Sequence, residues 1–183
     1  MDLGLVEAAQ RGDRDSFADL MRSVGDGLYA LAYRILRDPQ LAQDAFQETA
    51  IAVWRQLPNL RDPERFDAWI HRILVHACYA ESRKRTRWTA NVRVIGVDED
   101  PSADPPPSIL DRDELERGFA QLSVDHRVVF VMHHYVGLSL VEIADRLGIP
   151  AGTARSRLHY AAQALREALA EDAAPRARKE RLA

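Results

Sequence analysis

The chain has 183 residues, with 25 lysines and arginines against 28 aspartates and glutamates, a formal net charge of −3 and one cysteine. This length allows one medium domain or two small ones, and the apolar content of 46% is ordinary for a globular protein. A lone cysteine excludes an internal disulfide and a cysteine-rich zinc site, and no apolar run approaches the roughly 18 residues of a membrane span, so we expect a cytoplasmic protein without membrane insertion.

The first part of the chain carries the periodicity of three helices. Apolar residues recur at helical spacing over 17–36, and Pro39 ends this helix because proline disfavours helical conformation in the residue before it. A second helix is predicted over 41–57, stopped by Pro58, and a third over 66–87. The apolar positions that we expect the third helix to bury are Phe66, Trp69, Ile70, Ile73, Leu74 and Ala77. Cys78, among them, is expected to be a buried, inert thiol.

The second predicted helix has one polar face. The spacing i, i+3, i+4, i+7 and i+11 places five residues on one side: Asp44, Gln47, Glu48, Ile51 and Arg55. Apolar residues occupy the other side: Ala45, Phe46, Val53 and Leu57. An exposed face that mixes carboxylates, an amide and an isoleucine suits docking on a protein partner, and the alternative is a solvated face with no partner.

The third predicted helix ends in the basic sequence SRKRTR (82–87), and the same part of the chain holds Trp54, Trp69, Tyr79 and Trp88. Arginines beside aromatic rings can bind single-stranded DNA, because phosphates contact the guanidinium groups and unstacked bases contact the rings. The alternative places Trp54 and Trp69 in the hydrophobic core, and we expect this for both.

An acidic, proline-rich stretch, VDEDPSADPPPSILDRDE (97–114), separates this part from the rest. Such a composition cannot bury enough apolar area to fold alone. We therefore predict an all-α protein of two small helical domains, at 1–88 and 111–172, joined by a flexible acidic linker at 89–110 and followed by a basic tail at 173–183.

Four helices are predicted after the linker: a short one at 115–119, then SVDHRVVFVMHHYVG, SLVEIADRLG and AGTARSRLHYAAQALREALAED. Ser139 and Glu142 have the spacing of a capping box, Gly148 suits a left-handed helix end, and Pro150 follows in the turn. Two helices joined in this way form a helix-turn-helix.

The last helix is amphipathic. We expect its inward face to contain Ala154, Leu158, Ala161 and Leu165. The opposite face carries Thr153, Ser156, Arg157 and Tyr160, with Arg155 and His159 on its flank. Hydroxyl and guanidinium groups near the start of an exposed helix are what major-groove reading requires, so we predict DNA binding, with Arg157 toward the groove and Arg155 at its edge. A solvated polar face is the alternative.

Three segments resemble, in order, the small bacterial sigma factors of the extracytoplasmic-function (ECF) group, which belong to the sigma-70 family and keep only its regions 2 and 4. They are DAFQETAIAVW, then FDAWIHRI leading into SRKRTR, and LSLVEIADRLGIPAGTARSRL. The resemblance implies that Asp44, Gln47, Glu48 and Ile51 dock on the clamp helices of core RNA polymerase.

The same resemblance implies two contacts with promoter DNA. The loop PNLRDPER and the third helix would open and read the −10 element through Arg61, Arg65, Arg72, His76, Arg83, Lys84, Arg85 and Arg87. The helix-turn-helix would read the −35 element through Thr153, Arg155, Ser156, Arg157 and Tyr160. The acidic linker would lie in the template-strand and RNA-exit path of the polymerase. An anti-sigma partner is implied, and no catalytic role, cofactor, metal or small-molecule substrate.

The sequence departs from the family pattern at several positions. His76 stands where asparagine is most common, Ala50 where a bulkier apolar residue is common, and Tyr160 and Ala162 where arginines are frequent. An imidazole at position 76 could contact an unpaired base or serve only as a surface histidine, and both interpretations stay open.

Two other classes of protein are alternatives for this sequence. A helix-turn-helix regulator acting without holoenzyme formation would need no polymerase-binding face. An enzyme is suggested by His126, His133, His134 and Asp125, but no H-E-x-x-H motif is present. Adjacent histidines on a helix also point about 100° apart, so one metal ion cannot readily bind both.

Overall fold

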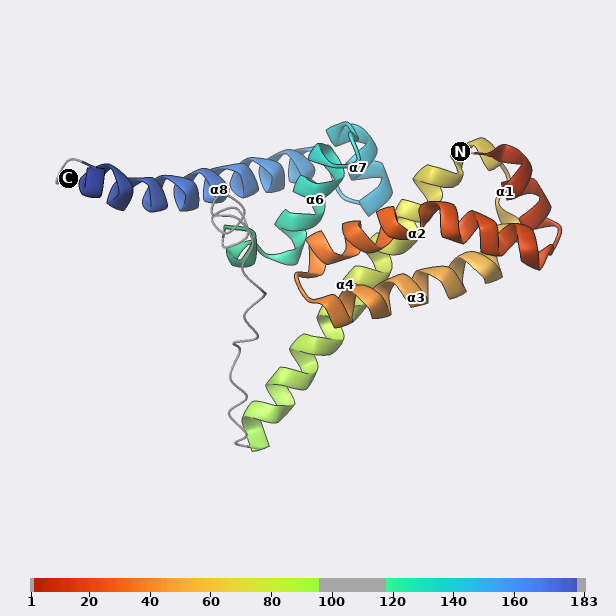
Figure 1. The fold of residues 1–183 in the computed structure, drawn as a ribbon, viewed down its shortest axis with the longest axis horizontal. Coiled ribbons are helices and arrows are strands. Elements are labelled where there is room, and N and C mark those ends of the chain that lie inside the picture. Colours follow the sequence, from red (N-terminus) through yellow and green to blue (C-terminus); the bar gives the residue numbers. More distant parts are fainter. Residues whose placement is uncertain (1, 96–117, 181–183) are drawn as a thin grey trace. The chain divides into compact units, whose positions relative to one another are not determined.

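The computed structural model describes residues 2–95 and 118–180, with side chains over 2–87 and 118–168. The chain divides into two compact units, Met1–Asn91 and Val92–Ala183. Every regular element of the described residues is helical (Figure 1), which confirms the predicted all-α class with two helical units. The acidic stretch at 97–114 lies outside the described residues.

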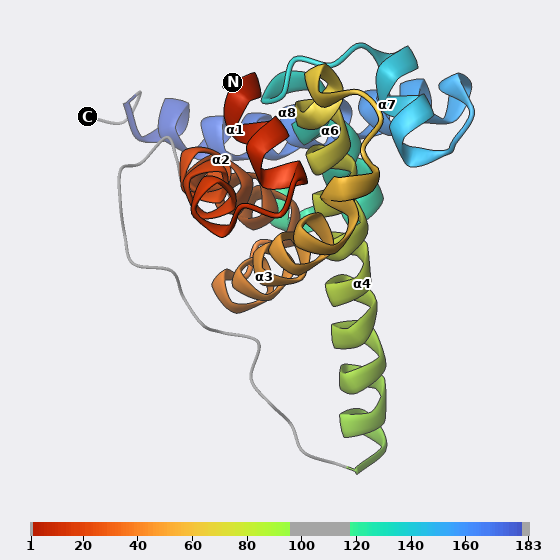
Figure 2. The ribbon, with the colours of Figure 1, turned by 90° about the vertical axis from the view of Figure 1, so that its right-hand side faces the viewer.

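The first unit is a bundle in which α2 packs on both α1 and α3. The views in Figures 1 and 2 agree that the C-terminal half of α4 extends beyond the α2–α3 pair. Its elements are α1 (Leu3–Gln10), α2 (Arg14–Leu36), α3 (Pro39–Gln56), two 3-10 turns (Leu57–Asn59 and Pro63–Arg65) and α4 (Phe66–Ile95).

Helix α1 was not predicted. It has only eight residues, too few to be stable alone or to show a clear apolar period, and it buries Val6 and Ala9. The side-chain amide of Gln10 donates hydrogen bonds to the carbonyls of Leu57 at 3.2 Å and Leu60 at 2.7 Å. Packing against distant parts of the chain therefore stabilises this helix.

The junction of α2 and α3 has the predicted break at Pro39. Arg37 ends α2 in the left-handed conformation, at φ 60°, and its N–H donates to the carbonyl of Tyr33. Asp38 then caps α3, with its carboxylate accepting from the N–H groups of Gln40 and Leu41 at 2.9 and 3.0 Å. Pro39 occupies the first helical position, where its missing N–H costs nothing, so α3 begins at Pro39 rather than at residue 41.

Helix α4 buries a different face from the predicted one. Phe66, Ile70, Leu74 and Cys78 are buried as expected, but so are two residues that were not predicted in this face: Val75 and Glu81. Trp69, Ile73 and Ala77 are only partly buried. The helix also continues past residue 87 to Ile95, because no glycine or proline occurs in it before Gly96.

In the second unit, α6 and α7 pack on each other and on α8. The far half of α8 extends beyond them (Figure 1). The elements are a short helix at 118–121, α6 (Val124–His134), α7 (Leu140–Leu147) and α8 (Ala151–Glu180). Residues 173–180, expected in a tail, have helical backbone, with Pro175 among them.

The core of the second unit follows the predicted pattern on α8. Ala154, Ala161 and Leu165 are buried, and Leu158 is half-buried. They pack in a unit whose other buried residues are Gly118, Phe119, Leu122, Val128, Val129, Val131, Met132, Ile143 and Ala144. The side of α8 that packs inward is therefore the side that the sequence indicated.

Candidate functional site

Helix α3 presents the polar face that the spacing predicted. Gln47, Glu48 and Arg55 are exposed, Ile51 is 46% exposed and Asp44 is half-buried. The side-chain amide of Gln40 donates to a carboxylate oxygen of Asp44 at 3.3 Å. The opposite side of the helix is buried through Ala45 and Val53, with Leu57 just beyond its end. The exposure of this face is confirmed, and its partner stays a prediction.

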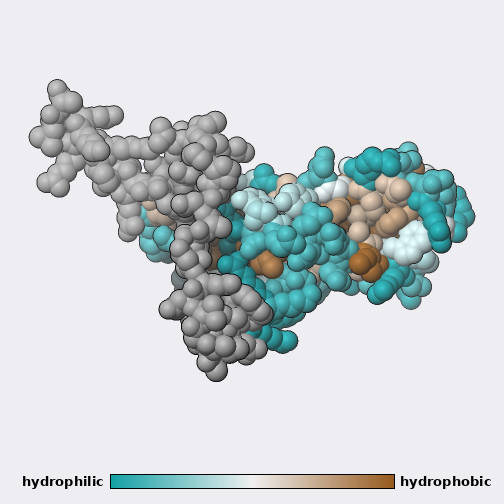
Figure 3. Space-filling view, turned by 60° about the horizontal axis from the view of Figure 1, so that its bottom comes forward, coloured by the Kyte–Doolittle hydropathy of each residue, from teal (hydrophilic) through white to brown (hydrophobic). Residues whose placement is uncertain are grey.

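Trp54 extends this surface, and its expected place in the core is wrong. The indole is 39% exposed, because it packs edge-on against the ring of Phe17, with 4.8 Å between ring centroids, and one side stays open. The expectation for Trp69 is also wrong in part, since that side chain is only half-buried. In Figure 3 most of the described surface is hydrophilic, and hydrophobic residues, in tan and brown, gather mainly toward the right-hand end.

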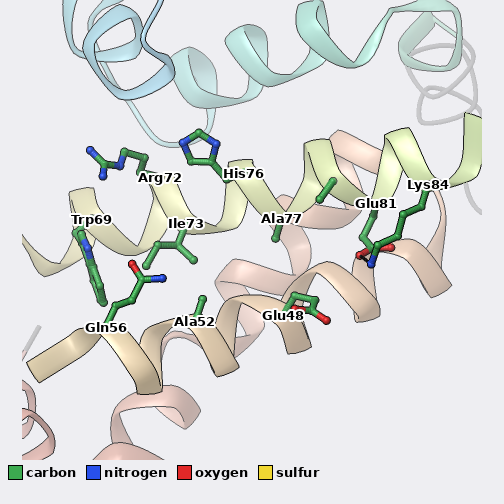
Figure 4. A pocket seen from close by; sticks show the side chains of 11 residues that line it. Glu48, Ala52, Gln56, Trp69, Arg72, Ile73, His76, Ala77, Glu81 and Lys84 are labelled. Atoms are coloured by element: carbon green, nitrogen blue, oxygen red, sulfur yellow. Dashed lines mark hydrogen bonds and ion pairs between the residues drawn. The ribbon is translucent and has the colours of Figure 1, made fainter. Parts of the chain in front are cut away.

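A groove of about 450 Å³ separates α3 from α4. Figure 4 shows Trp69, Ile73 and Ala77 pointing toward α3, whereas Arg72 and His76 point away from it. The lining residues are Glu48, Ala52, Gln56, Trp69, Arg72, Ile73, His76, Ala77, Ala80, Glu81 and Lys84. Arg72 and His76 are both exposed, one helical turn apart, as expected for residues of an outward face.

Part of the basic end of α4 is paired with carboxylates of its own unit. The ammonium of Lys84 lies 2.6 Å from a carboxylate oxygen of the buried Glu81. The hydrogen bond and charge of Glu81 raise the pKa of Lys84, and the charges of Glu48 and Asp44 raise it further. Arg85 donates to the carboxylate of Asp38 at 3.2 Å, which joins α4 to the cap of α3.

The other residues predicted at the −10 element are exposed: Arg61, Arg65, Arg83 and Arg87. Glu81, the partner of Lys84, is not among the predicted site residues. The i, i+3 spacing could have indicated the pair, but the burial of Glu81 could not be read from the sequence.

Cys78 is buried in α4. Burial raises the pKa of its thiol to about 12, because the thiolate would lose its hydration. The thiol is therefore neutral at physiological pH, which confirms the expected inert cysteine.

The helix-turn-helix has each of the predicted end signals. The backbone N–H of Ser139 donates to the carboxylate of Glu142 at 2.9 Å, and the N–H of Glu142 donates to the hydroxyl of Ser139 at 3.3 Å. The hydroxyl of Ser139 also donates to the carboxylate of Glu142 at 2.7 Å, and this bond and the one from the Ser139 N–H lower the pKa of Glu142. Gly148 ends α7 at φ 64°, and α8 begins at Ala151, directly after Pro150.

The exposed start of α8 differs from the prediction in the placement of two arginines. Arg157, expected toward the groove, is only 23% exposed, and its guanidinium lies 2.6 Å from the carboxylate of Asp125 on α6. Arg155, expected at the edge, is exposed, as are Ser156 and Tyr160. The side chain of Arg157 is therefore less exposed than expected, because it pairs with a carboxylate on a neighbouring helix, and its contact with the groove stays a prediction.

Thr153 is half-buried, and its carbonyl accepts a hydrogen bond from the hydroxyl of Ser156 at 3.0 Å. His159 is exposed beside Tyr160, with 5.9 Å between ring centroids. The exposed imidazole of His159, predicted on the flank of the polar face, therefore lies next to the ring of Tyr160.

The histidines on α6 have local partners. A ring nitrogen of His133 lies 2.7 Å from the carbonyl of Leu138, and the ring of His134 packs on Phe130 at 4.3 Å. Burial lowers the pKa of His134, and His133 lowers it further. Over the described side chains, no three His, Cys, Asp or Glu residues lie close enough together to hold a metal ion. No helix in the described ranges is long and apolar enough to cross a membrane.

Comparison with known proteins identifies both units. The sigma-70 region 2 model matches residues 20–88, and the sigma-70 region 4 model matches residues 118–167. ECF RNA polymerase sigma factor SigE of Mycolicibacterium smegmatis is 34% identical over 85% of this chain, which spans 62% of that relative. ECF RNA polymerase sigma factor SigL of Mycobacterium tuberculosis is 35% identical over 84% of this chain and 91% of its own length.

A solved structure is similar over most of the chain. The sigma factor RpoE of Bartonella quintana, in complex with the anti-sigma factor NepR, has a TM-score of 0.69 and 26% identity, covering 84% of this chain and 96% of that one. Both regions therefore occur in order, and the likeness extends along nearly the whole length of a relative and of a solved structure. The chain belongs to the sigma-70 family, in its ECF group of RNA polymerase sigma factors.

Proposed function

We propose that this chain binds core RNA polymerase in the cytoplasm and directs transcription from its own class of promoters. The observation that carries the proposal is the order of two sigma regions, 20–88 and 118–167, on two separate helical units. Each unit has an exposed polar helix face, one on α3 and one on α8. We keep the predicted domains, at 1–88 and 111–172, as the working boundaries of these activities.

The α3 face is the proposed polymerase contact. Asp44, Gln47 and Glu48 supply polar contacts, and Ile51 supplies apolar area. The exposed indole of Trp54 adds area beside Ile51, and tryptophan is among the residues most often found at the energetic centre of an interface. Charged residues at the rim would steer association with a basic partner surface.

The outward side of α4 and the turn before it are the proposed contact with the opened −10 element. The exposed candidates are Arg61, Arg65, Arg72, His76, Arg83 and Arg87. Lys84 and Arg85 keep more than half of their side chains exposed, so their ion pairs are weak, and they contribute positive potential more than specific contacts. The half-exposed ring of Trp69 offers a stacking surface in the groove.

Helix α8 is the proposed reader of the −35 element. In a helix-turn-helix the second helix enters the major groove with its N-terminal residues toward the bases. Thr153, Arg155, Ser156 and Tyr160 occupy this part of α8. Arg155 is the exposed guanidinium among them, and arginine is the commonest specific contact to guanine.

Control by an anti-sigma factor is also proposed. The supporting observation is the similarity to RpoE, whose structure contains NepR. The acidic linker is long enough to let two domains close around such a partner. In the holoenzyme, its negative charge suits the polymerase path that the growing RNA later occupies.

Reconstitution with core RNA polymerase tests the proposal. We expect the chain to co-elute with core enzyme on gel filtration and to support transcription from a subset of a promoter library. A helix-turn-helix regulator acting without holoenzyme would bind DNA alone, would not co-elute and would give no transcript. That result would reject the proposed function.

A further inference from the structure

Asp125, in the first turn of α6, forms an ion pair with Arg157 of α8, the proposed reading helix. Asp125 lies two positions after Ser123, whose hydroxyl caps α6. Its carboxylate is 2.6 Å from the guanidinium of Arg157, and the two side chains are 44% and 23% exposed. Short bonds between ionised groups are the stronger class of hydrogen bond. The pair joins two helices that are 32 residues apart in the chain.

A second contact from the same turn reaches the same side of α8. The ring of His126 lies 6.1 Å from the ring of Tyr160, which is three positions after Arg157 and largely exposed. Adjacent residues of α6 thus contact side chains on neighbouring turns of α8. Over residues 118–168, Arg155 has no such ion pair and faces solvent.

This arrangement opposes a base-reading role for Arg157. To reach a base, its guanidinium would have to give up a charge-assisted bond. It would also leave the carboxylate of Asp125 unpaired near DNA phosphates, where like charges repel. A contact between Arg155 and a base would break no such bond and leave no carboxylate unpaired, because Arg155 is already exposed.

We propose that Asp125 and Arg157 are a positioning pair: they fix the orientation of α8 on α6, so that Arg155, Ser156 and Tyr160 meet the −35 bases, and Arg157 itself reads none. This inference rests on the proposed function of the chain at promoters. It assigns a promoter-binding role to Asp125, a residue outside the recognition helix.

The test uses the full chain assembled with core RNA polymerase on DNA randomised at the −35 positions. The variants are Asp125→Asn, Arg157→Ala, their double variant and Arg155→Ala, with Asp145→Asn as the matched control for loss of an exposed carboxylate in the same unit. Circular dichroism establishes that each variant is folded at the temperature of the assay.

We expect Asp125→Asn and Arg157→Ala each to lower promoter affinity about three- to tenfold for all sequences alike. The double variant should be no weaker than the weaker single variant, because both remove one interaction. Neither should change the salt dependence of binding. Arg155→Ala should change the preferred −35 sequence and flatten the salt slope by about one unit. Asp145→Asn should behave as the wild type.

Several results would overturn the inference. Additive effects of the two single changes, or a relaxed −35 preference or a flatter salt slope for Arg157→Ala, would mean that Arg157 contacts DNA directly. Wild-type affinity in folded variants would mean that the pair serves stability alone. If Arg157→Ala is unfolded, Arg157→Lys, which keeps the charge, decides instead: an altered base preference overturns the inference and an unchanged one supports it.

Failure of the proposed function would look different. In that case the wild-type chain itself would form no holoenzyme or select no −35 sequence. The variants test the positioning role of Asp125 and Arg157 once the wild-type chain has formed holoenzyme and selected a −35 sequence.

Discussion

Within each of the two units, the stabilising interactions that we describe span a different distance along the chain. In the helix-turn-helix, Ser139 pairs with Glu142 and Gly148 ends the same helix, so the decisive signals lie within one short stretch. In the first unit, Gln10 bonds to Leu57 and Leu60, and Arg85 to Asp38, across 47 to 50 residues. Signals of the first kind can be read from the sequence, whereas those of the second exist only once the bundle has formed.

Both units contain an ion pair of the same kind. In each, a basic residue of a proposed DNA-binding helix is paired with an aspartate of a neighbouring helix: Arg85 with Asp38, and Arg157 with Asp125. A count of lysines and arginines therefore overstates the positive charge that is free to meet phosphates. The distinction between exposed and paired cations is a property of the folded units.

The largest expected effect concerns the α3 face, the proposed polymerase contact of the first unit. Replacing Asp44 and Glu48 together with lysine should abolish holoenzyme assembly, a loss of at least about 100-fold in affinity, because like charges across an interface cost several kcal/mol. Helical content should stay unchanged. Co-elution with core polymerase measures the effect, and Asp19→Lys with Asp26→Lys on α2 makes the same charge change as a control. Normal assembly of the α3 variant would show that the docking site lies elsewhere.

The long-range core of the first unit should be the most sensitive to truncation. Phe66 is fully buried at the start of α4, so Phe66→Ala should lower the free energy of unfolding by about 3–5 kcal/mol. Ile51→Ala, at an exposed position on α3, is the control and should cost much less. Urea unfolding measures both. Similar losses for the two variants would contradict the burial of Phe66.

Two glycines distinguish backbone effects in the two units. Gly148 has φ 64° and free space around it, so Gly148→Ala should destabilise the helix-turn-helix by about 1–2 kcal/mol through the backbone alone. Gly27 lies within α2, also with free space, so Gly27→Ala should stabilise the first unit by about 0.5–1 kcal/mol. Thermal unfolding measures whether each variant is less or more stable than the wild type. A loss in both variants would mean that the space around Gly27 is not free.

His76 permits a test of reading in the first unit. His76→Asn should keep polymerase binding and −35 recognition but change the preferred −10 base, because an amide and an imidazole offer different hydrogen-bonding groups to an unpaired base. Permanganate footprinting on promoters that vary in the −10 bases measures the preference. Identical preferences in the two proteins would leave His76 as a surface residue without a DNA role.

The smallest effect concerns the pH dependence of the capping box. The folded pKa of Glu142 is lowered below its ordinary value of 4.5 by the hydrogen bonds from Ser139. Its stabilising contribution is therefore fully present above pH 4.5 and is lost as the pH falls through the lowered folded pKa. Glu142→Gln should remove this part of the acid destabilisation, measured as unfolding midpoints across that range. Parallel pH profiles of the variant and the wild type would show that the ionised carboxylate of Glu142 contributes nothing to stability.

Local signals in the sequence predict the helical class, the breaks and most of the buried faces. Pro39 and Pro58 marked the ends of helices, since proline acts on its immediate neighbours. Ser139, Glu142 and Gly148 determined the helix-turn-helix through contacts within a few residues. The exposed face of α3 followed from the helical period, and so did the inward face of α8.

The exposure and pairing of individual side chains depend on how the helices pack. Helix α1 is stabilised by the hydrogen bond from Gln10 to the distant carbonyl of Leu60. Trp54 is partly exposed because Phe17 covers only one side of its ring. Arg157 is less exposed than expected because Asp125, on another helix, lies within hydrogen-bonding distance. The physical reason is common to all three: helical periodicity gives the direction of a side chain, but its burial and pairing depend on atoms that come near only when the helices pack.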